Sequence, residues 1–298
     1  MKLGFSFILS KEKITMNQQS TLDTSAKPLS KAIWLWLVVD CVIVFIAGTQ
    51  LFLLSDFTNL FFAWTIAPSL SATFLGSGYW SSIPLLYFSS RQKTWTRARV
   101  SVFGILLFSI LTLVATLMHI DRFHLADLNP TARFAAWVWL TIYIVFPPLL
   151  AGLLIWQIRI PGGEPPRDAP LAVWLRVVLA LQGIILFSLG ILLFIAPTGV
   201  TWAWTLTPLT GRAIAAWLIG VGVIALQMGW ENDSTRVDAG LLSYALFGGL
   251  QLFALLRYAG SFNWGAPVAI LYLGFIVSII IIGGYGWFTA RRASQSVA

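Results

Sequence analysis

The amino-acid sequence predicts an all-α fold, a polytopic membrane helix bundle of about eight transmembrane helices arranged as two tandem four-helix units. Three observations predict it. Of 298 residues, 58% are hydrophobic and only 10% are charged, whereas soluble domains carry about 25% charged residues. The apolar residues gather in stretches long enough to cross ~30 Å of hydrocarbon at about 1.5 Å per residue. A short motif from the first half of the chain also recurs in the second half.

Hydropathy places the eight expected helices along the chain. The first four belong to a unit over residues 33–158, and the last four belong to a unit over residues 174–290. Each apolar stretch is followed by polar or charged residues, which mark the loops. The expected helices cover 33–54, 69–90, 100–120, 134–157, 174–196, 208–230, 239–258 and 266–289.

The segments outside the two units are polar. Residues 1–32 lack hydrophobic periodicity over most of their length, which predicts a flexible cytoplasmic N-terminal tail. Within it, Met16 is an alternative to Met1 as the start of the protein. A cytoplasmic linker rich in Pro and Gly joins the units at 159–173, and a short cytoplasmic tail follows at 291–298.

Basic residues predict the orientation in the membrane. Of 19 Lys and Arg residues, all but four fall on the side that holds both termini, the loop after the second helix and the linker. Because cytoplasmic segments carry an excess of Lys and Arg, we expect a multi-pass protein of the cell membrane with its N-terminus and C-terminus in the cytoplasm. The same excess explains the net charge of +8 without nucleic acid as a partner. The four residues on the other side are Arg122, Arg133, Arg212 and Arg257.

An internal repeat supports the two units. The segment Ala63–Pro68 (AWTIAP) recurs 140 residues later as Ala203–Pro208 (AWTLTP), with four of six positions identical. Because each unit holds an even number of spans, both units start on the same side of the membrane. Such parallel repeats are related by an axis along the membrane normal.

The repeated motif and the helix that follows its second copy supply three candidate ligand-binding residues. Trp64 and Trp204 each lie just before a helix N-terminus, whose partial positive charge attracts anionic groups. Arg212, one turn inside the sixth helix, would reinforce the second of these sites. The structural alternative is a proline-started helix with an aromatic belt at the membrane interface, which explains the same residues without a ligand.

Two further candidates lie at the ends of helices on the same outer side. Arg257 ends the seventh helix and His119 ends the third. Interaction with the helix dipole, or a long side chain that reaches toward water, accounts for Arg257 without a ligand. If the units pack about a pseudo-twofold axis, these two residues should converge with Trp64, Trp204 and Arg212 on an outer vestibule that binds a small anionic or aromatic ligand.

Asp40 is the one carboxylate deep inside an expected span. Charged groups in the hydrocarbon region are costly, so an intramembrane carboxylate is a functional hypothesis by default. Coupling to a proton or a cation is one reading, and an interhelical hydrogen bond is the other. The corresponding stretch of the second unit, 180–182, is uncharged, so no symmetric ion pathway is expected.

Metal and enzyme chemistry find little support. The two histidines, His119 and His124, are five residues apart, which does not place them on one helix face, so no metal site, haem or other cofactor is expected. The sequence has no His-Glu-x-x-His, no Gly-x-Ser-x-Gly and no phosphate-binding loop motif, which disfavours an enzyme. The single cysteine, Cys41, excludes an intrachain disulfide.

The leading hypothesis is therefore a small-molecule or ion transporter, a permease with its site between two parallel repeats. The rivals are a membrane-embedded enzyme or redox-associated subunit that uses the outer histidines, and a non-catalytic membrane scaffold. The expected partners are the lipid bilayer and a small anionic or aromatic ligand, with the oligomeric state left open.

Overall fold

A computed structural model describes residues 26–297 of the chain, and side chains up to residue 292. Most of the expected tail at 1–32, including Met16, lies outside the described residues. The last residues before the first long helix are ordered, since the Lys27 and Leu29 N–H groups donate to Gly163 O and Lys93 O. The regular structure of the described part is helical, with two isolated β-bridges and no strand.

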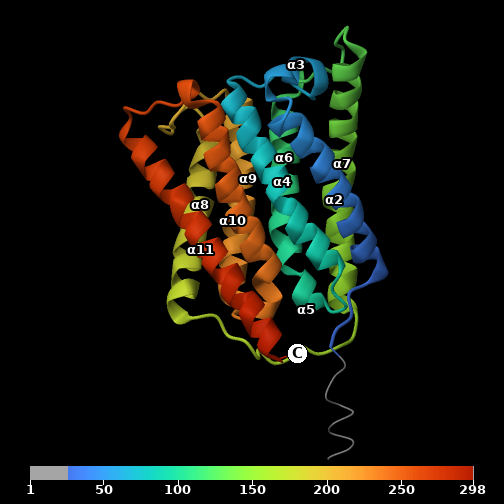
Figure 1. Ribbon diagram of the computed structural model, residues 1–298. Coiled ribbons are helices and arrows are strands. Elements are labelled where there is room, and N and C mark those ends of the chain that lie inside the picture. The colour runs from blue at the N-terminus through green and yellow to red at the C-terminus, as the bar shows by residue number, and fades with distance from the viewer. Residues whose placement is uncertain (1–25, 298) are drawn as a thin grey trace, which may run out of the picture.

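Eight long helices form a bundle whose axes run roughly side by side (Figure 1). Short helical turns cover the loops at its ends, and sequence patterning did not predict them. The long helices are α2 (Lys31–Phe52), α4 (Ser69–Ser90), α6 (Val100–Met118), α7 (Pro130–Arg159), α8 (Val173–Ile195), α9 (Pro208–Glu231), α10 (Ser234–Arg257) and α11 (Pro267–Val297). The short ones are η1 (Ser55–Phe57), α3 (Thr58–Phe61), α5 (Trp95–Ala98), η2 (Ile120–Arg122) and η3 (Ala259–Ser261).

Seven of the long helices are long and apolar enough to cross a membrane. The helical, multi-pass membrane bundle predicted from the sequence is therefore confirmed in its main feature. The eighth, α4, has the same length of 22 residues as α2 but is rich in Ser and Gly. It packs between α2 and α10, and most of its residues are buried. Neighbouring helices therefore shield its polar groups from lipid.

Close backbone contacts hold the helices together through glycines. A Cβ atom built on Gly76 of α4 would lie 2.6 Å from the backbone nitrogen of Phe52 in α2. A Cβ atom built on Gly222 of α9 would lie 2.8 Å from the backbone nitrogen of Phe187 in α8. Small residues at helix interfaces are typical of membrane bundles, where tight packing replaces the hydrophobic driving force.

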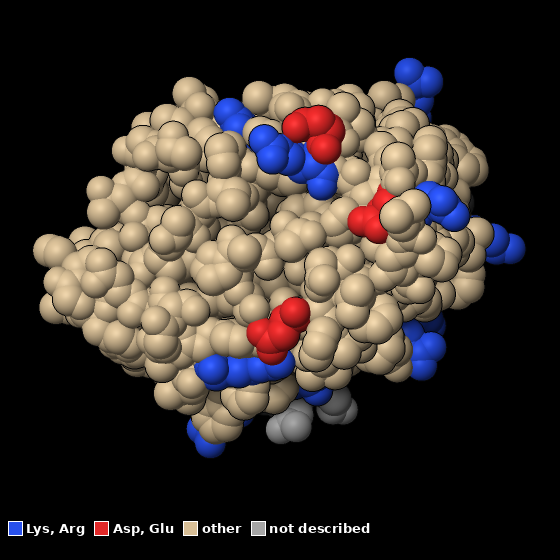
Figure 2. Space-filling view, turned by 90° about the horizontal axis from the view of Figure 1, so that it is seen from above, with Lys and Arg blue, Asp and Glu red and all other residues tan. Residues whose placement is uncertain are grey.

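The two ends of the bundle differ in charge. The end that holds the start of α2, the end of α11 and the linker 160–172 carries most of the described Lys and Arg, and we name it the basic end (Figure 1). The opposite end, the far end, carries the loops 53–68, 119–129, 196–207 and 258–266. Figure 2 shows this far end as a mostly uncharged surface with a few separate charged groups. The charge difference is the one the positive-inside rule uses.

The loops of the far end are built alike in both halves of the chain. The His124 N–H donates to Ala63 O over 2.9 Å, and the Asn263 N–H donates to Ala203 O over 2.8 Å. Each donor follows a short turn, η2 or η3, at the end of α6 or α10. The repeated motif therefore receives the same backbone hydrogen bond in each half.

Two local features are not apparent from the sequence. Pro147 and Pro148 lie inside α7, which is assigned as one helix across them. The acidic residues Glu231, Asp233 and Asp238 lie where two helices nearly meet, since α9 reaches Glu231 and α10 starts at Ser234. Glu231 and Asp233 are buried, and Arg236 in the first turn of α10 pairs with both, while Arg99 from the first half of the chain also pairs with Glu231.

Candidate functional site

A cavity of about 70 Å³ lies in the middle of the bundle. Six long helices contribute to its wall, namely α2, α4, α6 and α7 of the first half and α9 and α10 of the second half. Its volume is several times the roughly 10–15 Å³ that one water molecule needs. The cavity therefore lies where the two halves of the chain meet and has room for a small ligand.

Asp40 is the one charged residue among the described residues that line this cavity. It is 7% exposed, and its Oδ2 atom has no hydrogen-bond partner. One helical turn earlier, the Nε1 atom of Trp36 is also buried without a partner and belongs to the same wall. Buried polar groups in folded proteins are nearly always paired. An unpaired acceptor and an unpaired donor of the described residues therefore lie beside the same cavity.

Aromatic rings form a large part of the wall. Tyr79 of α4 and Tyr143 of α7 share a hydrogen bond between their hydroxyl groups of 2.7 Å. Trp217 of α9 packs against Tyr79 in an edge contact with 4.9 Å between ring centroids. Phe108 of α6 lies against Trp217 with a centroid distance of 4.1 Å. Because the two tyrosine hydroxyls bind each other, these rings present mainly apolar edges and π-faces.

The serine hydroxyls of the wall are already engaged. Ser81 and Ser82 both donate to Gly78 O, and Ser109 donates to Leu106 O. Ser243 of α10 accepts the Leu85 N–H of α4 over 2.9 Å. Pro84, just before Leu85, interrupts the regular helix hydrogen bonds of α4. The contact with Ser243 thus joins the two halves beside the cavity.

The corresponding stretch of α8 has a different environment. Gln182 is buried, its Nε2 donates to Ser278 Oγ over 2.9 Å, and its Oε1 accepts the Tyr244 hydroxyl over 3.1 Å. Gln182 therefore makes the interhelical hydrogen bonds that were the structural alternative for Asp40. Among the described residues, the Oδ2 atom of Asp40 has no such partner.

At the far end, the structure brings together two of the predicted residues. Arg212 at the start of α9 donates from Nη1 to Nε2 of His119, just past α6, over 2.8 Å. Partial burial lowers the pKa of His119, and the Arg212 guanidinium lowers it further. The Nε atom of Arg212 is buried without a partner. This contact links the two halves of the chain and favours a neutral imidazole.

Arg257 makes a second link between the halves at the far end. Its Nη1 donates to Phe52 O over 2.7 Å, and its Nη2 donates to Leu53 O and to Asp56 Oδ2. The guanidinium thus satisfies carbonyls at the C-terminus of α2, where helices leave such groups unpaired. Hydrogen bonds from Ser69 and Tyr258, with Arg257 nearby, hold the pKa of Asp56 below its usual value.

The two tryptophans of the motif are buried in separate aromatic clusters instead of lying at the lipid interface. Trp64 is 3% exposed and packs on Trp139 and Phe123. Trp204 is 4% exposed, packs on Tyr272 and donates from Nε1 to Ser71 Oγ over 2.8 Å. The structure therefore joins Arg212 to His119 but distributes Trp64, Trp204 and Arg257 among other partners.

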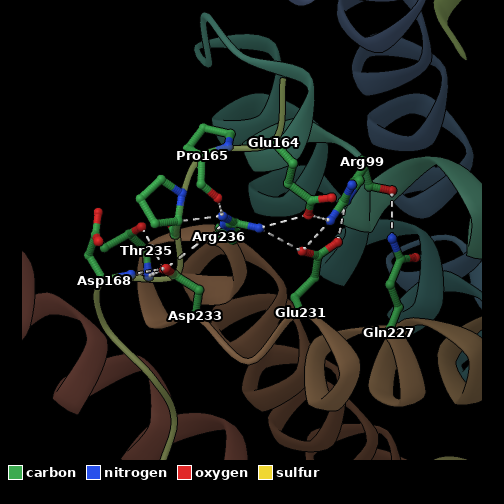
Figure 3. A network of polar contacts seen from close by, with 10 residues as sticks. Arg99, Glu164, Pro165, Asp168, Gln227, Glu231, Asp233, Thr235 and Arg236 are labelled. Atoms are coloured by element: carbon green, nitrogen blue, oxygen red, sulfur yellow. Dashed lines mark hydrogen bonds and ion pairs between the residues drawn. The ribbon is translucent and has the colours of Figure 1, made fainter. Parts of the chain in front are cut away.

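A network of charged residues closes the basic end (Figure 3). Arg99, before α6, donates from Nη2 to Glu231 Oε2 at the end of α9 over 2.8 Å. The Nη1 atom of Arg236 in α10 lies 3.1 Å from Oε1 of Glu164 in the linker and 3.5 Å from Oε2 of Glu231. The Arg99 guanidinium also binds Glu164 and holds its pKa below the usual value. Both halves and the linker meet in this network.

The sequence indicated Asp40 as a candidate, and this residue lines the cavity. The sequence did not indicate the charged network at the basic end or the aromatic wall of the cavity. Arg99 and Glu231 are 132 positions apart, and nothing in their local sequence shows that they meet. Among 15 tryptophans, Trp217 has no distinguishing neighbour in the sequence. The isolation of one carboxylate in an apolar stretch was the only local signal of the cavity.

Metal ligands are not grouped in the described part of the chain, which holds no cluster of three or more His, Cys, Asp or Glu. His124 uses both ring nitrogens, toward Thr65 Oγ1 and Phe62 O, each over 3.0 Å. Its side chain thus fixes the loop of the repeated motif.

No protein-family model, curated protein or solved structure matches this chain. The class of protein is therefore defined by its fold alone, as an integral, multi-pass helical membrane protein.

Proposed function

We propose that this protein is a small-molecule or ion permease whose binding site is the cavity beside Asp40. The observation that carries the proposal is a buried, unpartnered carboxylate oxygen in a cavity formed by both halves of the chain. Transporters built from repeats bind their substrates near the middle of the membrane, between the repeats.

The two tandem four-helix units belong to this proposal. The motif at 63–68 and 203–208 and its matching backbone hydrogen bonds support them. Helix packing supports them as well, because α2 packs on α4 as α8 packs on α9. Contacts between the units show the same correspondence. The second helix of each unit packs on the third helix of the other, since α4 packs on α10 and α9 packs on α6. The units would lie at 33–158 and 174–290, with the linker 159–173 between them.

Contacts at both ends of the bundle fit a protein that opens to one side at a time. Arg212 with His119 and Arg257 with Phe52 join the halves at the far end. Arg99 with Glu231 joins them at the basic end. We assign the basic end to the cytoplasm of a cell membrane because it holds most of the positive charge. Breaking one set of contacts while keeping the other would expose the cavity to one side.

Thiol labelling tests the proposal without knowledge of the substrate. Cys41 is the only cysteine, so a Cys41→Ala background removes all thiols. In that background, Ser109→Cys places one thiol in the cavity wall. A small reagent that does not cross membranes should label this thiol in vesicles of both orientations. Labelling from neither side would reject a permease.

A matched control lies on the same helix. Ser101 is fully buried, donates to Ala98 O as Ser109 donates to Leu106 O, and does not line the cavity. Ser101→Cys should stay unlabelled in either orientation. If both thiols react equally, the protein is loosely packed and the labelling says nothing specific about the cavity, so the proposal loses its support.

The outer site for an anionic or aromatic ligand is a separate, weaker proposal. Arg212 is engaged by His119, yet its Nε keeps an unused N–H. Inorganic phosphate or benzoate that protects the protein from thermal unfolding, with loss of protection in Arg212→Gln, would support it. The expected loss is about 1.5–3 kcal/mol of binding free energy for one charge-assisted hydrogen bond.

A further inference from the structure

We propose that the cavity beside Asp40 recognises a small organic cation, an alkylammonium group held between the carboxylate and the surrounding aromatic rings. This inference rests on the proposed binding site and adds the chemical class of its ligand. Four features of the cavity wall support a cationic ligand.

The charge of the cavity is one-sided. Asp40 is its only carboxylic acid, and neither Lys nor Arg is among the described residues that line it. Arg99, Arg212 and Arg257, toward the two ends of the bundle, bind Glu231, His119 and a backbone carbonyl. A lone buried carboxylate is costly, and a cation placed beside it offsets that cost. An anion in the same place would add a second uncompensated negative charge.

The aromatic wall suits an alkylated cation. Trp36, Tyr79, Phe108, Tyr143 and Trp217 all line the cavity. The negative face of an aromatic ring attracts a cation, most strongly for Trp, and clusters of such rings bind quaternary ammonium groups. The methyl groups of such a ligand would also replace contacts with water by contacts with the rings.

The same wall is poor in free oxygen ligands, which argues against a metal ion. Calcium takes six to eight oxygen ligands, and magnesium requires a nearly complete octahedron. The hydroxyls of Tyr79 and Tyr143 bind each other, and those of Ser81, Ser82 and Ser109 donate to carbonyls of their own helices. Asp40 is the one carboxylate among the described residues that line the cavity, and one carboxylate with a few neutral hydroxyls does not replace the hydration shell of an inorganic cation.

The outer part of the wall is apolar and loosely joined. Ile43 of α2 and Ile142 and Phe146 of α7 line the cavity and are only partly buried. These two helices make few contacts with each other. A ligand that combines a positive charge with alkyl groups fits such a wall better than a hydrated ion does.

Thermal unfolding of the purified full-length protein tests the inference with choline as the probe. Dimethylbutanol is its uncharged counterpart, with carbon in place of the quaternary nitrogen, and sodium chloride controls for ionic strength. Choline should raise the melting temperature in a saturable manner, and neither control should do so at the same concentration. Equal stabilisation by dimethylbutanol would show an apolar site only, and equal stabilisation by sodium would show an inorganic cation site. Either result overturns the inference.

Variants locate the effect. Asp40→Asn keeps the shape of the side chain and should weaken choline binding at least about tenfold, as expected for loss of a charged partner. Trp217→Leu should weaken it by roughly twofold to thirtyfold through loss of a cation–π contact. Trp174→Leu, on the exposed side of α8, should leave it unchanged. Unchanged affinity in folded Asp40→Asn would place the cation elsewhere and contradict the inference.

The outcome is separable from that of thiol labelling. Labelling of Ser109→Cys from both sides without any choline effect would keep the permease and reject the cation. Choline stabilisation without labelling would keep the binding site and reject transport.

Discussion

Asp40 and Glu231 are two buried carboxylates with opposite surroundings. Glu231 is fully buried at the basic end and contacts both Arg99 and Arg236, while Asp40 is 7% exposed in the middle of the bundle and pairs with no Lys or Arg among residues 26–292. A paired buried charge holds segments of the chain together, and its loss exposes an uncompensated partner. A buried carboxylate without a cationic partner lowers the stability of the fold, and a bound cation can supply the missing partner. The comparison separates an acid with a structural partner from the acid that we propose binds a ligand.

The largest effect should come from breaking the paired acid. Arg236 is 4% exposed and contacts Glu231, Glu164 and Asp233. Arg236→Met should lower the free energy of unfolding by about 3–5 kcal/mol, because it removes a buried guanidinium that pairs with Glu231 and Asp233 and leaves Arg99 as the one remaining described cation at Glu231. Chemical denaturation in detergent measures this change.

The control for that variant is an exposed pair. Arg122 and Asp121 form an ion pair at the far end with both side chains exposed. Arg122→Gln should change the free energy of unfolding by less than about 1 kcal/mol. Equal effects of the two variants would show that burial of the network at the basic end does not matter.

A smaller loss of stability is expected at Gln182, the neutral residue in the stretch of α8 that corresponds to Asp40 of α2. Gln182 on α8 binds both Ser278 and Tyr244. Gln182→Leu should lower the free energy of unfolding by about 1–3 kcal/mol, because the buried Tyr244 hydroxyl loses its acceptor and the half-buried Ser278 hydroxyl loses a donor. Choline protection should persist in this variant, since Gln182 does not line the cavity.

Removal of the unpaired acid should act in the opposite direction. Asp40→Leu should raise the free energy of unfolding by about 1 kcal/mol or more, because the variant no longer buries a polar group without a hydrogen bond. The same unfolding measurement decides the sign. A loss comparable to that of Arg236→Met would mean that Asp40 has a structural partner, and the contrast with Glu231 would disappear.

The smallest effect concerns His119, next to Arg212. Its pKa is lower in the folded protein than the usual 6.5, through burial first and the Arg212 guanidinium second, with Asp121 opposing and Arg122 adding to the shift. A base with a lowered pKa binds fewer protons when folded, so its stabilising contribution is present above about pH 6.5 and is lost as the pH falls through the folded pKa.

The readout is the melting temperature between pH 8 and pH 5. His119→Gln keeps a hydrogen-bond acceptor for Arg212 but has no proton to gain in this range. It should therefore show a smaller decrease on acidification than the natural protein. Identical pH profiles would remove His119 from the contacts that hold the far end together.

The sequence predicted the positions of the long helices because an apolar stretch of about 20 residues has few alternatives in a membrane. It predicted Asp40 as a candidate for the same reason, since a charge stands out against an apolar background. The partners of a buried charge depend on tertiary contacts. The local sequence around Glu231 therefore does not show that this side chain is buried between Arg99 and Arg236. The aromatic wall was equally hidden, because Trp217 does not differ in sequence from a tryptophan that faces lipid.

The most direct test of the account is the charge selectivity of a thiol in the cavity wall. In the Cys41→Ala background, Ser109→Cys should react faster with a trimethylammonium thiosulfonate than with a sulfonate thiosulfonate of similar size, after correction for their reactivity with a free thiol. Adding Asp40→Asn should bring the two rates together. Equal rates with Asp40 intact, or a preference that survives Asp40→Asn, would contradict the account, because the carboxylate would not then control what enters the cavity.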